Sequence, residues 1–158
     1  MPFSALTTAN QFYELAKSQG RTLTNMQLQK LVFLAQGYCL ALLGRKLFYH
    51  NVHAWQWGPV IPKLYKPLMK YGSGEVKDRL PDDGEKIPED SEEYGVILAI
   101  WKAFGSYTGA RLSGITHQEG SPWSITWNSD KFGIIPDDLI TEYYKKLLNV
   151  QANPQDVS

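Results

Sequence analysis

The chain has 158 residues, of which 43% are hydrophobic, 13% aromatic and 20% charged, and its formal net charge at pH 7 is zero. This composition excludes a chain that is disordered throughout, because disorder requires lower hydrophobicity and a larger net charge. The length suits one hydrophobic core, so we expect a single domain over residues 1–150 and a flexible polar tail over residues 151–158. The one cysteine, Cys39, excludes an internal disulfide.

Charge is distributed unevenly along the chain. Residues 1–72 contain eight Lys or Arg and one acid, Glu14, whereas residues 73–158 contain eight Lys or Arg and fifteen Asp or Glu. The first half could form a basic surface for nucleic acid or for an acidic partner. Alternatively, the two halves pack together and their charges compensate. The second interpretation is favoured, because the basic residues are spread singly and form no Lys/Arg-rich cluster.

The first 44 residues predict two helices. An amphipathic pattern indicates a helix over Thr7–Ser18. Thr24 followed three residues later by Gln27 fits a capping box, and the helix that it opens should run to about Leu43, where Gly44 stops it. This second helix is apolar on nearly every side, so we expect it to be central and buried, with Cys39 inside it. Gln36 should then be buried and hydrogen-bonded.

The next segment changes character. Residues 46–57 are rich in aromatic side chains and predict an extended segment or short strand, with its aromatic face (His53, Trp55 and Trp57) turned inward. Gly58-Pro59 should end it and lead into a helix over about Val60–Tyr71, with a kink or break at Pro67. Residues 75–91 contain several acids, prolines and a glycine, and predict a loop.

Four helices are predicted in the second half of the chain. Their expected ranges are Ser91–Ser106, Gly109–Glu119 after a Thr108 cap, a short one from Ser121-Pro122 through Trp127, and one from Pro136 to about Asn149. The predicted fold class is therefore mainly α, a helical domain of about six to seven helices with a short extended segment near residues 46–57.

The sequence contains no arrangement typical of a catalytic or metal site. His50 and His53 are too far from a further His or Cys to complete a zinc site, and their spacing places them on opposite faces of an extended segment. A buried Cys39 is a poor nucleophile. No glycine-rich phosphate loop follows a strand. We therefore expect no catalytic residue, no metal, no cofactor and no small-molecule ligand, and a protein that is not an enzyme.

The first 44 residues could also form a DNA-binding motif. Residues 7–43 could form a helix-turn-helix, but the second helix is too apolar to present a recognition surface to DNA.

The sequence gives no sign of membrane targeting. No signal peptide is recognisable at the N-terminus, and no run of about 18 apolar residues predicts a membrane span. We expect a cytoplasmic protein that does not contact a membrane.

Two blocks contain polar residues that local structure does not require. Leu28-Gln-Lys-Leu31 is followed by Trp57-Gly-Pro-Val60, in which glycine and proline fit a turn but Lys30 stands in an apolar helix. It either reaches solvent at the exposed end of the helix or contacts something outside the chain. The block His117–Trp123 reads as a tight helix–helix corner. His117 and Glu119 could contact a partner or form hydrogen bonds within that corner.

These blocks resemble a known family. LQKLVFLAQGY (28–38), WGPVIPKLY (57–65), YG (71–72), LSGITHQEGSPW (112–123) and the segment 135–144 occur in order and together resemble the Panacea domain, the SocA-like antitoxin or phage-associated GepA-like family. The resemblance covers roughly residues 7–148. It implies a mostly helical, prophage-type antitoxin that neutralises a toxin encoded beside it, usually by direct binding. One member of the family delivers its toxin to a Clp-type protease, but no matching motif is present here.

The leading hypothesis is thus the antitoxin component of a toxin–antitoxin system, with the cognate toxin protein as its partner and a Clp-type protease as a further partner if it acts as an adaptor. A toxin that binds RNA would favour the acidic segment 82–93 as a contact. The alternative is a nucleic-acid-binding regulator that uses the basic N-terminal half. The partner-binding candidates are Lys30, Trp57, Tyr65, His117 and Glu119.

Overall fold

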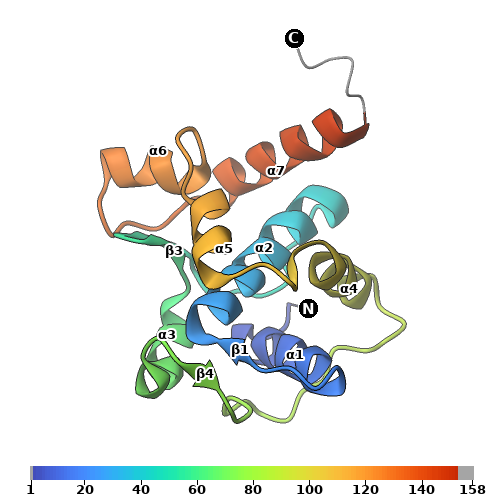
Figure 1. Cartoon of the computed structure of the whole chain (residues 1–158). Coiled ribbons are helices and arrows are strands. Elements are labelled where there is room, and N and C mark those ends of the chain that lie inside the picture. The colour runs from blue at the N-terminus through green and yellow to red at the C-terminus, as the bar shows by residue number, and fades with distance from the viewer. Residues whose placement is uncertain (1, 153–158) are drawn as a thin grey trace.

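The computed structural model describes residues 2–152 and confirms a mainly α fold (Figure 1). Seven α-helices lie within the described residues: α1 (Ala5–Ser18), α2 (Asn25–Leu43), α3 (Pro62–Leu68), α4 (Glu92–Phe104), α5 (Gly109–Thr116), α6 (Pro122–Ser129) and α7 (Asp137–Ala152). The strands β1 (Leu23–Thr24) and β4 (Glu75–Val76) form one antiparallel pair, and β2 (His53–Trp55) and β3 (Gly58–Val60) form another. Of the predicted tail, residues 153–158 lie outside the described residues, while 151 and 152 continue α7.

Helix α2 runs through the middle of the molecule and contacts α1, α4, α5 and α7 (Figure 1). The predicted capping box is present, because the Thr24 hydroxyl accepts from the Gln27 amide and the Gln27 side chain accepts from the Thr24 amide. Gly44, with φ of 69°, ends the helix as expected. All residues from 28 to 40 are buried, so α2 is the core helix that its sequence predicts.

The expectation that no segment reaches the range of a membrane span was wrong. By length and hydropathy, α2 qualifies, although 72% of the qualifying window is buried inside the fold. The window is apolar because it packs against five other helices, so its composition has an explanation within the protein.

Buried amide side chains attach loops to the helices. Gln36, expected to be buried and hydrogen-bonded, donates to the Phe48 carbonyl at 2.8 Å and accepts from the Leu47 and Phe48 amides at 2.8 and 3.2 Å. Asn10 on α1 holds the loop before α4 in a similar way, because its side chain donates to the Leu80 carbonyl and accepts from the Leu80 amide. Each amide replaces two or three backbone hydrogen bonds that a sheet would have supplied.

The expected helix over residues 60–71 was partly wrong. Residues 58–60 form strand β3, and α3 begins only at Pro62. The reason is a long-range contact: the Gln29 side chain accepts from the Ile61 amide at 3.1 Å and donates to the Ile61 carbonyl at 3.2 Å, which keeps this residue extended. The break expected at Pro67 is confirmed, because α3 ends at Leu68 and continues as a 3-10 helix, η1 (Met69–Tyr71).

The four helices of the second half begin near the predicted residues. Ser91, Thr108 and Ser121 cap α4, α5 and α6 through their hydroxyl groups. Helix α5, however, stops at Thr116 instead of Glu119. The Thr116 hydroxyl donates to two carbonyls of its own helix, and a turn at Gln118–Ser121 follows. A back-bonding threonine disfavours continuation of the helix, which explains the shorter length.

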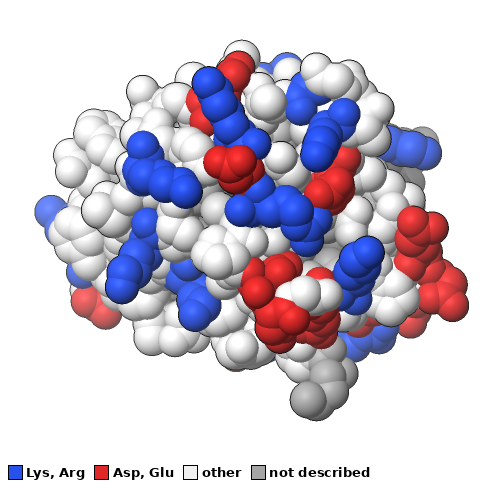
Figure 2. All heavy atoms as spheres, turned by 90° about the horizontal axis from the view of Figure 1, so that it is seen from below, with Lys and Arg blue, Asp and Glu red and all other residues white. Residues whose placement is uncertain are grey.

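The basic and acidic halves pack together and share their charges, as favoured above. Among the described residues, ion pairs join Arg45 to Glu92 and Glu93, Lys46 to Asp137, and Arg79 to Glu14. Figure 2 shows the face seen from below, on which Lys and Arg alternate with Asp and Glu. This face therefore presents no continuous field of one sign.

Candidate partner-binding site

The block Trp57–Val60 lies in a β-hairpin whose turn is formed by Gln56 and Trp57. Strand β2 pairs with β3 in antiparallel register, with Ala54 opposite Pro59 and Trp55 opposite Gly58. The prediction that the aromatic face of this segment points inward was wrong: the small side chain of Ala54 is buried, whereas Trp57 is 68% exposed. The hairpin packs on helices α2, α5 and α6, and only small residues fit against them.

Lys30, the polar residue of the first block, lies beneath this hairpin. Its side chain is 1% exposed, and its ammonium donates to the Pro59 carbonyl at 2.8 Å. The prediction that Lys30 lies on the surface was therefore wrong. Gly58 makes the approach possible, because a Cβ at this position would stand 2.9 Å from Lys30 Nζ. Its positive φ of 119° is also a backbone conformation that glycine adopts more readily than any residue with a Cβ.

Burial alone dominates the electrostatics of Lys30. It lowers the pKa of the ammonium from the usual 10.5 to about 7, and no carboxylate counteracts this change. Removal from water disfavours the charged form of a lysine when no counter-ion compensates. Lys30 is thus a buried base that titrates near neutral pH.

A groove of about 470 Å³ opens above Lys30. It is lined by residues of α2, the hairpin, α3, the turn after η1 and the segment before α7: Asn25, Met26, Gln29, Lys30, Trp55, Gln56, Trp57, Val60, Tyr65, Gly72, Ser73 and Phe132. Its apolar lining is unusually exposed for large side chains, since Met26, Trp57, Tyr65 and Phe132 all have more than a third of their surface in solvent. Trp55 and Tyr65 pack edge to face, with ring centroids 4.8 Å apart.

Phe132 is held at the groove by a strained backbone. Its φ of 65° is the one positive value for a non-glycine residue among those described. The strain is balanced by bonds to the hairpin: the Phe132 amide donates to the Ala54 carbonyl at 2.9 Å, and the His53 ring nitrogen lies 3.0 Å from the Phe132 carbonyl. Strain of this kind costs about 1–3 kcal/mol and often marks functional positions.

The second block, His117–Trp123, supports the hairpin from behind. Ser113 on α5 donates to the Trp57 carbonyl at 2.9 Å and lies 3.3 Å from His117 Nδ1. The Trp123 indole donates to the Trp55 carbonyl, and His117 packs edge to face on Trp123. His117 is half-buried and forms contacts within the corner, while Glu119 is exposed and has no side-chain hydrogen bond or ion pair in the described structure.

Three of the five predicted residues therefore meet at one place. Lys30, Trp57 and Tyr65 line the groove, His117 lies behind the hairpin, and Glu119 lies outside it. Met26, Gln29 and Phe132 also line the groove but were not among the predicted residues. Gln29 stands inside the LQKL block and could have been noticed as a second polar residue on the buried helix, whereas nothing local marks Phe132.

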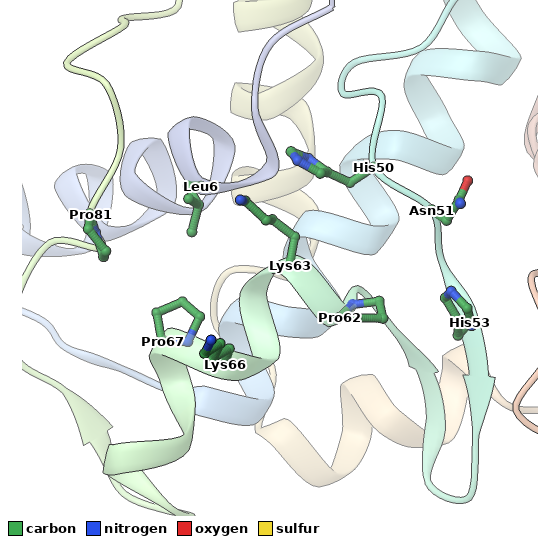
Figure 3. A pocket seen from close by; sticks show the side chains of 9 residues that line it. All are labelled: Leu6, His50, Asn51, His53, Pro62, Lys63, Lys66, Pro67 and Pro81. Carbon is green, nitrogen blue, oxygen red and sulfur yellow. The ribbon is translucent and has the colours of Figure 1, made fainter.

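A larger hollow of about 780 Å³ lies nearby and has a different character (Figure 3). Lys63 and Lys66 on α3 and His50 before β2 reach into it, with proline rings between them. Burial first, then Lys63 and Lys46, lower the pKa of His50. Both lysines are exposed, so this hollow contains no buried charge comparable with Lys30. We therefore regard the groove above Lys30 as the candidate site.

Within residues 2–152, neither a metal site nor a reactive thiol competes for that role. No group of three or more His, Cys, Asp or Glu that could hold a metal is found in residues 2–152. Cys39 is fully buried, and burial, with Glu93 as a further contribution, raises the pKa of its thiol to about 12. In the predicted acidic contact segment, Asp82 accepts from Asn10 and Glu93 pairs with Arg45, so part of its charge is used within the fold.

The helical fold with its two motif blocks packed around one hairpin defines a class of protein. Residues 28–124 match the family described as "Antitoxin SocA-like, Panacea domain", and the chain belongs to this family. Among curated proteins, the chain is similar to "Antitoxin SocA" of Caulobacter vibrioides (strain NA1000 / CB15N), with 28% identity over 132 residues that cover 78% of this chain and 70% of that protein. No solved structure gives a significant match. The matched range begins at Leu28 and ends at Ser124, so it includes both blocks and most of the groove lining, while Asn25, Met26 and Phe132 lie outside it.

Proposed function

We propose that this protein is an antitoxin that neutralises a cognate toxin by direct binding, and that the groove face binds the toxin. Membership of the SocA-like antitoxin family supports a toxin as the partner in general. In this proposal the protein is a cytoplasmic binding protein without catalytic activity. It acts by covering a functional surface of the toxin.

The observation that carries this proposal is the exposed apolar rim of the groove. Met26, Trp57, Tyr65 and Phe132 come from four different parts of the chain and converge there. Clustered, exposed aromatic side chains are uncommon on proteins that bind nothing, and Trp and Tyr are the residues that most often anchor protein interfaces. The rigid backbone around them, fixed by Gln29, Lys30 and Ser113, lowers the entropy lost on binding.

The test is rescue of growth in cells that express the toxin encoded beside the gene for this chain. Co-expression of the wild-type chain should restore growth, whereas Trp57→Ala should bind the toxin at least about tenfold more weakly because interface anchors commonly contribute 2 kcal/mol or more. Tyr49→Ala is the matched control, since Tyr49 is also an aromatic side chain more than half exposed but lies outside the groove. Equal rescue and equal affinity for both variants would contradict the assignment of the groove.

The same assay separates occlusion from delivery to a protease. In the proposed mechanism, rescue persists in a strain without Clp-type proteases, and the purified chain inhibits the toxin on its own. Rescue that depends on the protease would identify an adaptor instead.

Binding of nucleic acid is the second function considered. The mixed charges in Figure 2 and the pairing of Arg45 and Lys46 with acids of the second half do not favour it. A salt-dependent shift of promoter DNA by the purified chain would support it.

A further inference from the structure

The ammonium of Lys30 is the polar group that the fold explains least. An ammonium has three N–H donors, and Lys30 uses one of them, on the Pro59 carbonyl. Its nearest neighbours on the hairpin are Gly58 and Pro59, and it is among the residues that line the groove although its side chain is only 1% exposed. A buried charge with unused donors is costly unless a ligand or partner completes its bonds.

Other backbone carbonyls of the hairpin and of Ile61 accept from side chains other than Lys30. The Trp57 carbonyl accepts from Ser113, the Trp55 carbonyl accepts from Trp123, and the Ile61 carbonyl accepts from Gln29. Lys30 makes no second hydrogen bond within the described residues. What the groove lacks is an oxygen with negative charge.

We infer that the groove receives a segment of the toxin in which an Asp or Glu side chain stands between apolar residues, with the carboxylate bound by the Lys30 ammonium. This inference rests on the proposed function. The apolar neighbours of the acid would pack on Trp57, Tyr65 and Phe132, and the carboxylate would supply the missing acceptor. A side chain of a protein segment is the fitting source, because the lining combines large apolar residues such as Trp57, Tyr65 and Phe132 with the amides of Asn25, Gln29 and Gln56, which suit a peptide with apolar side chains.

Charge supports the same choice of occupant. The lining of the groove contains one charged side chain, Lys30, and no acid, so an acidic group meets attraction without local repulsion. Beyond the lining, the elements that form the groove carry His53 on β2, Lys63 and Lys66 on α3, and Asp130 and Lys131 in the segment before α7, while Arg111 lies on α5 and His117 at the end of that helix. Asp130 is the one acid in this set, and it does not line the groove.

Binding of a carboxylate should be coupled to proton uptake. In the unbound protein Lys30 titrates near pH 7, and a bound carboxylate favours its protonated form. Above pH 7 the complex must therefore bind a proton that the unbound protein has lost. Affinity for an acidic segment should fall about tenfold for each pH unit above 7, whereas affinity for a neutral segment should not change.

Two blocked peptides test the inference on the whole chain without a toxin: acetyl-Phe-Glu-Leu-amide and its glutamine counterpart, acetyl-Phe-Gln-Leu-amide. Binding is followed by NMR through the indole N–H signals of the tryptophans. We expect the glutamate peptide to bind at least about tenfold more tightly at pH 6.5 and to shift the signals of Trp55 and Trp57. Trp101 packs against Phe12 away from the groove and should not respond.

Three results would overturn the inference: equal affinities of the two peptides, no saturable binding below about 10 mM, or tighter binding of acetyl-Phe-Leu with a free C-terminal carboxylate. Lys30→Met should abolish the preference for glutamate, while Lys63→Met, which removes an exposed charge outside the groove, should retain it. If Lys30→Met does not fold, the pH profile of the wild-type chain decides alone, and a preference that does not change between pH 6.5 and 9 contradicts the inference.

The experiments can refute the carboxylate site and the antitoxin function separately. Rescue of toxin-expressing cells by both wild type and Lys30→Met, without a peptide preference, would refute the carboxylate site and leave the antitoxin function standing. A glutamate preference in a chain that rescues no neighbouring toxin would refute the function alone.

Discussion

Helix α2 fixes two extended segments by buried polar side chains, and the two attachments differ in kind. Gln36 holds residues 47 and 48 with a neutral amide that makes three hydrogen bonds. Lys30 holds Pro59 with a buried ammonium that makes one. The amide achieves its structural role without electrostatic cost, whereas the ammonium is expensive to bury. A structural role therefore explains Gln36 fully and Lys30 only in part.

The largest effect on stability is expected at Gln36, whose side chain makes three hydrogen bonds. Gln36→Leu should lower the free energy of unfolding by about 3–5 kcal/mol, because it leaves two amides and a carbonyl of residues 47 and 48 buried without partners. Urea denaturation measures this. Gln118→Leu, at an exposed position, should change stability by less than about 0.5 kcal/mol. Similar costs for both variants would show that the bonds of Gln36 are unimportant.

At Lys30, the charged attachment, the free energy of unfolding should depend on pH. The pKa of Lys30 is about 7 in the folded protein and near 10.5 when unfolded, so above pH 7 the unfolded chain binds more protons and the free energy of unfolding rises with pH. Relative to Lys30→Met, the wild type should gain about 2–3 kcal/mol between pH 6 and pH 9.

Urea denaturation of the wild type and of Lys30→Met at pH 6 and at pH 9 measures this difference. Other titrating groups contribute equally to both proteins, so their effects cancel. Lys63→Met should follow the pH dependence of the wild type, because Lys63 is exposed. A wild-type advantage that is the same at pH 6 and pH 9 would mean that Lys30 does not lose its proton near neutrality.

An effect of similar size is expected where the hairpin covers Lys30. Gly58→Ala should cost about 2–3 kcal/mol, because the new Cβ meets a positive φ and lies 2.9 Å from Lys30 Nζ. Gly44→Ala is the matched control: its φ is 69°, but a Cβ there meets nothing within 4 Å, so only about 1–2 kcal/mol should be lost. Equal losses in thermal or urea denaturation would show that contact with Lys30 adds nothing.

The smallest effect on stability is expected at the groove rim. Trp57→Ala should change the free energy of unfolding by less than about 0.5 kcal/mol, because the side chain is 68% exposed. The same variant should lose toxin binding, and this separation of binding from stability is typical of an interface residue. A loss of stability as large as that of Gly58→Ala would show instead that Trp57 is part of the fold.

The sequence by itself determined the features that depend on neighbouring residues. The Thr24–Gln27 capping box, the hydroxyl caps of α4, α5 and α6, the stop at Gly44 and the burial of α2 all follow from local hydrogen bonding and helical periodicity. The family was also identifiable at this level, because its motif blocks are local strings of residues.

Tertiary structure decided everything that joins distant residues. Strand β3 replaces the first turn of a helix because Gln29 binds Ile61, 32 residues away, and Lys30 is buried because Gly58 admits its ammonium beneath the hairpin. The aromatic face of the hairpin points outward because small residues alone fit against α2, α5 and α6. Phe132 reaches the groove through bonds to β2, 78 residues earlier at Ala54. Local preference cannot encode such contacts, since their free energy arises only when the separate segments have packed.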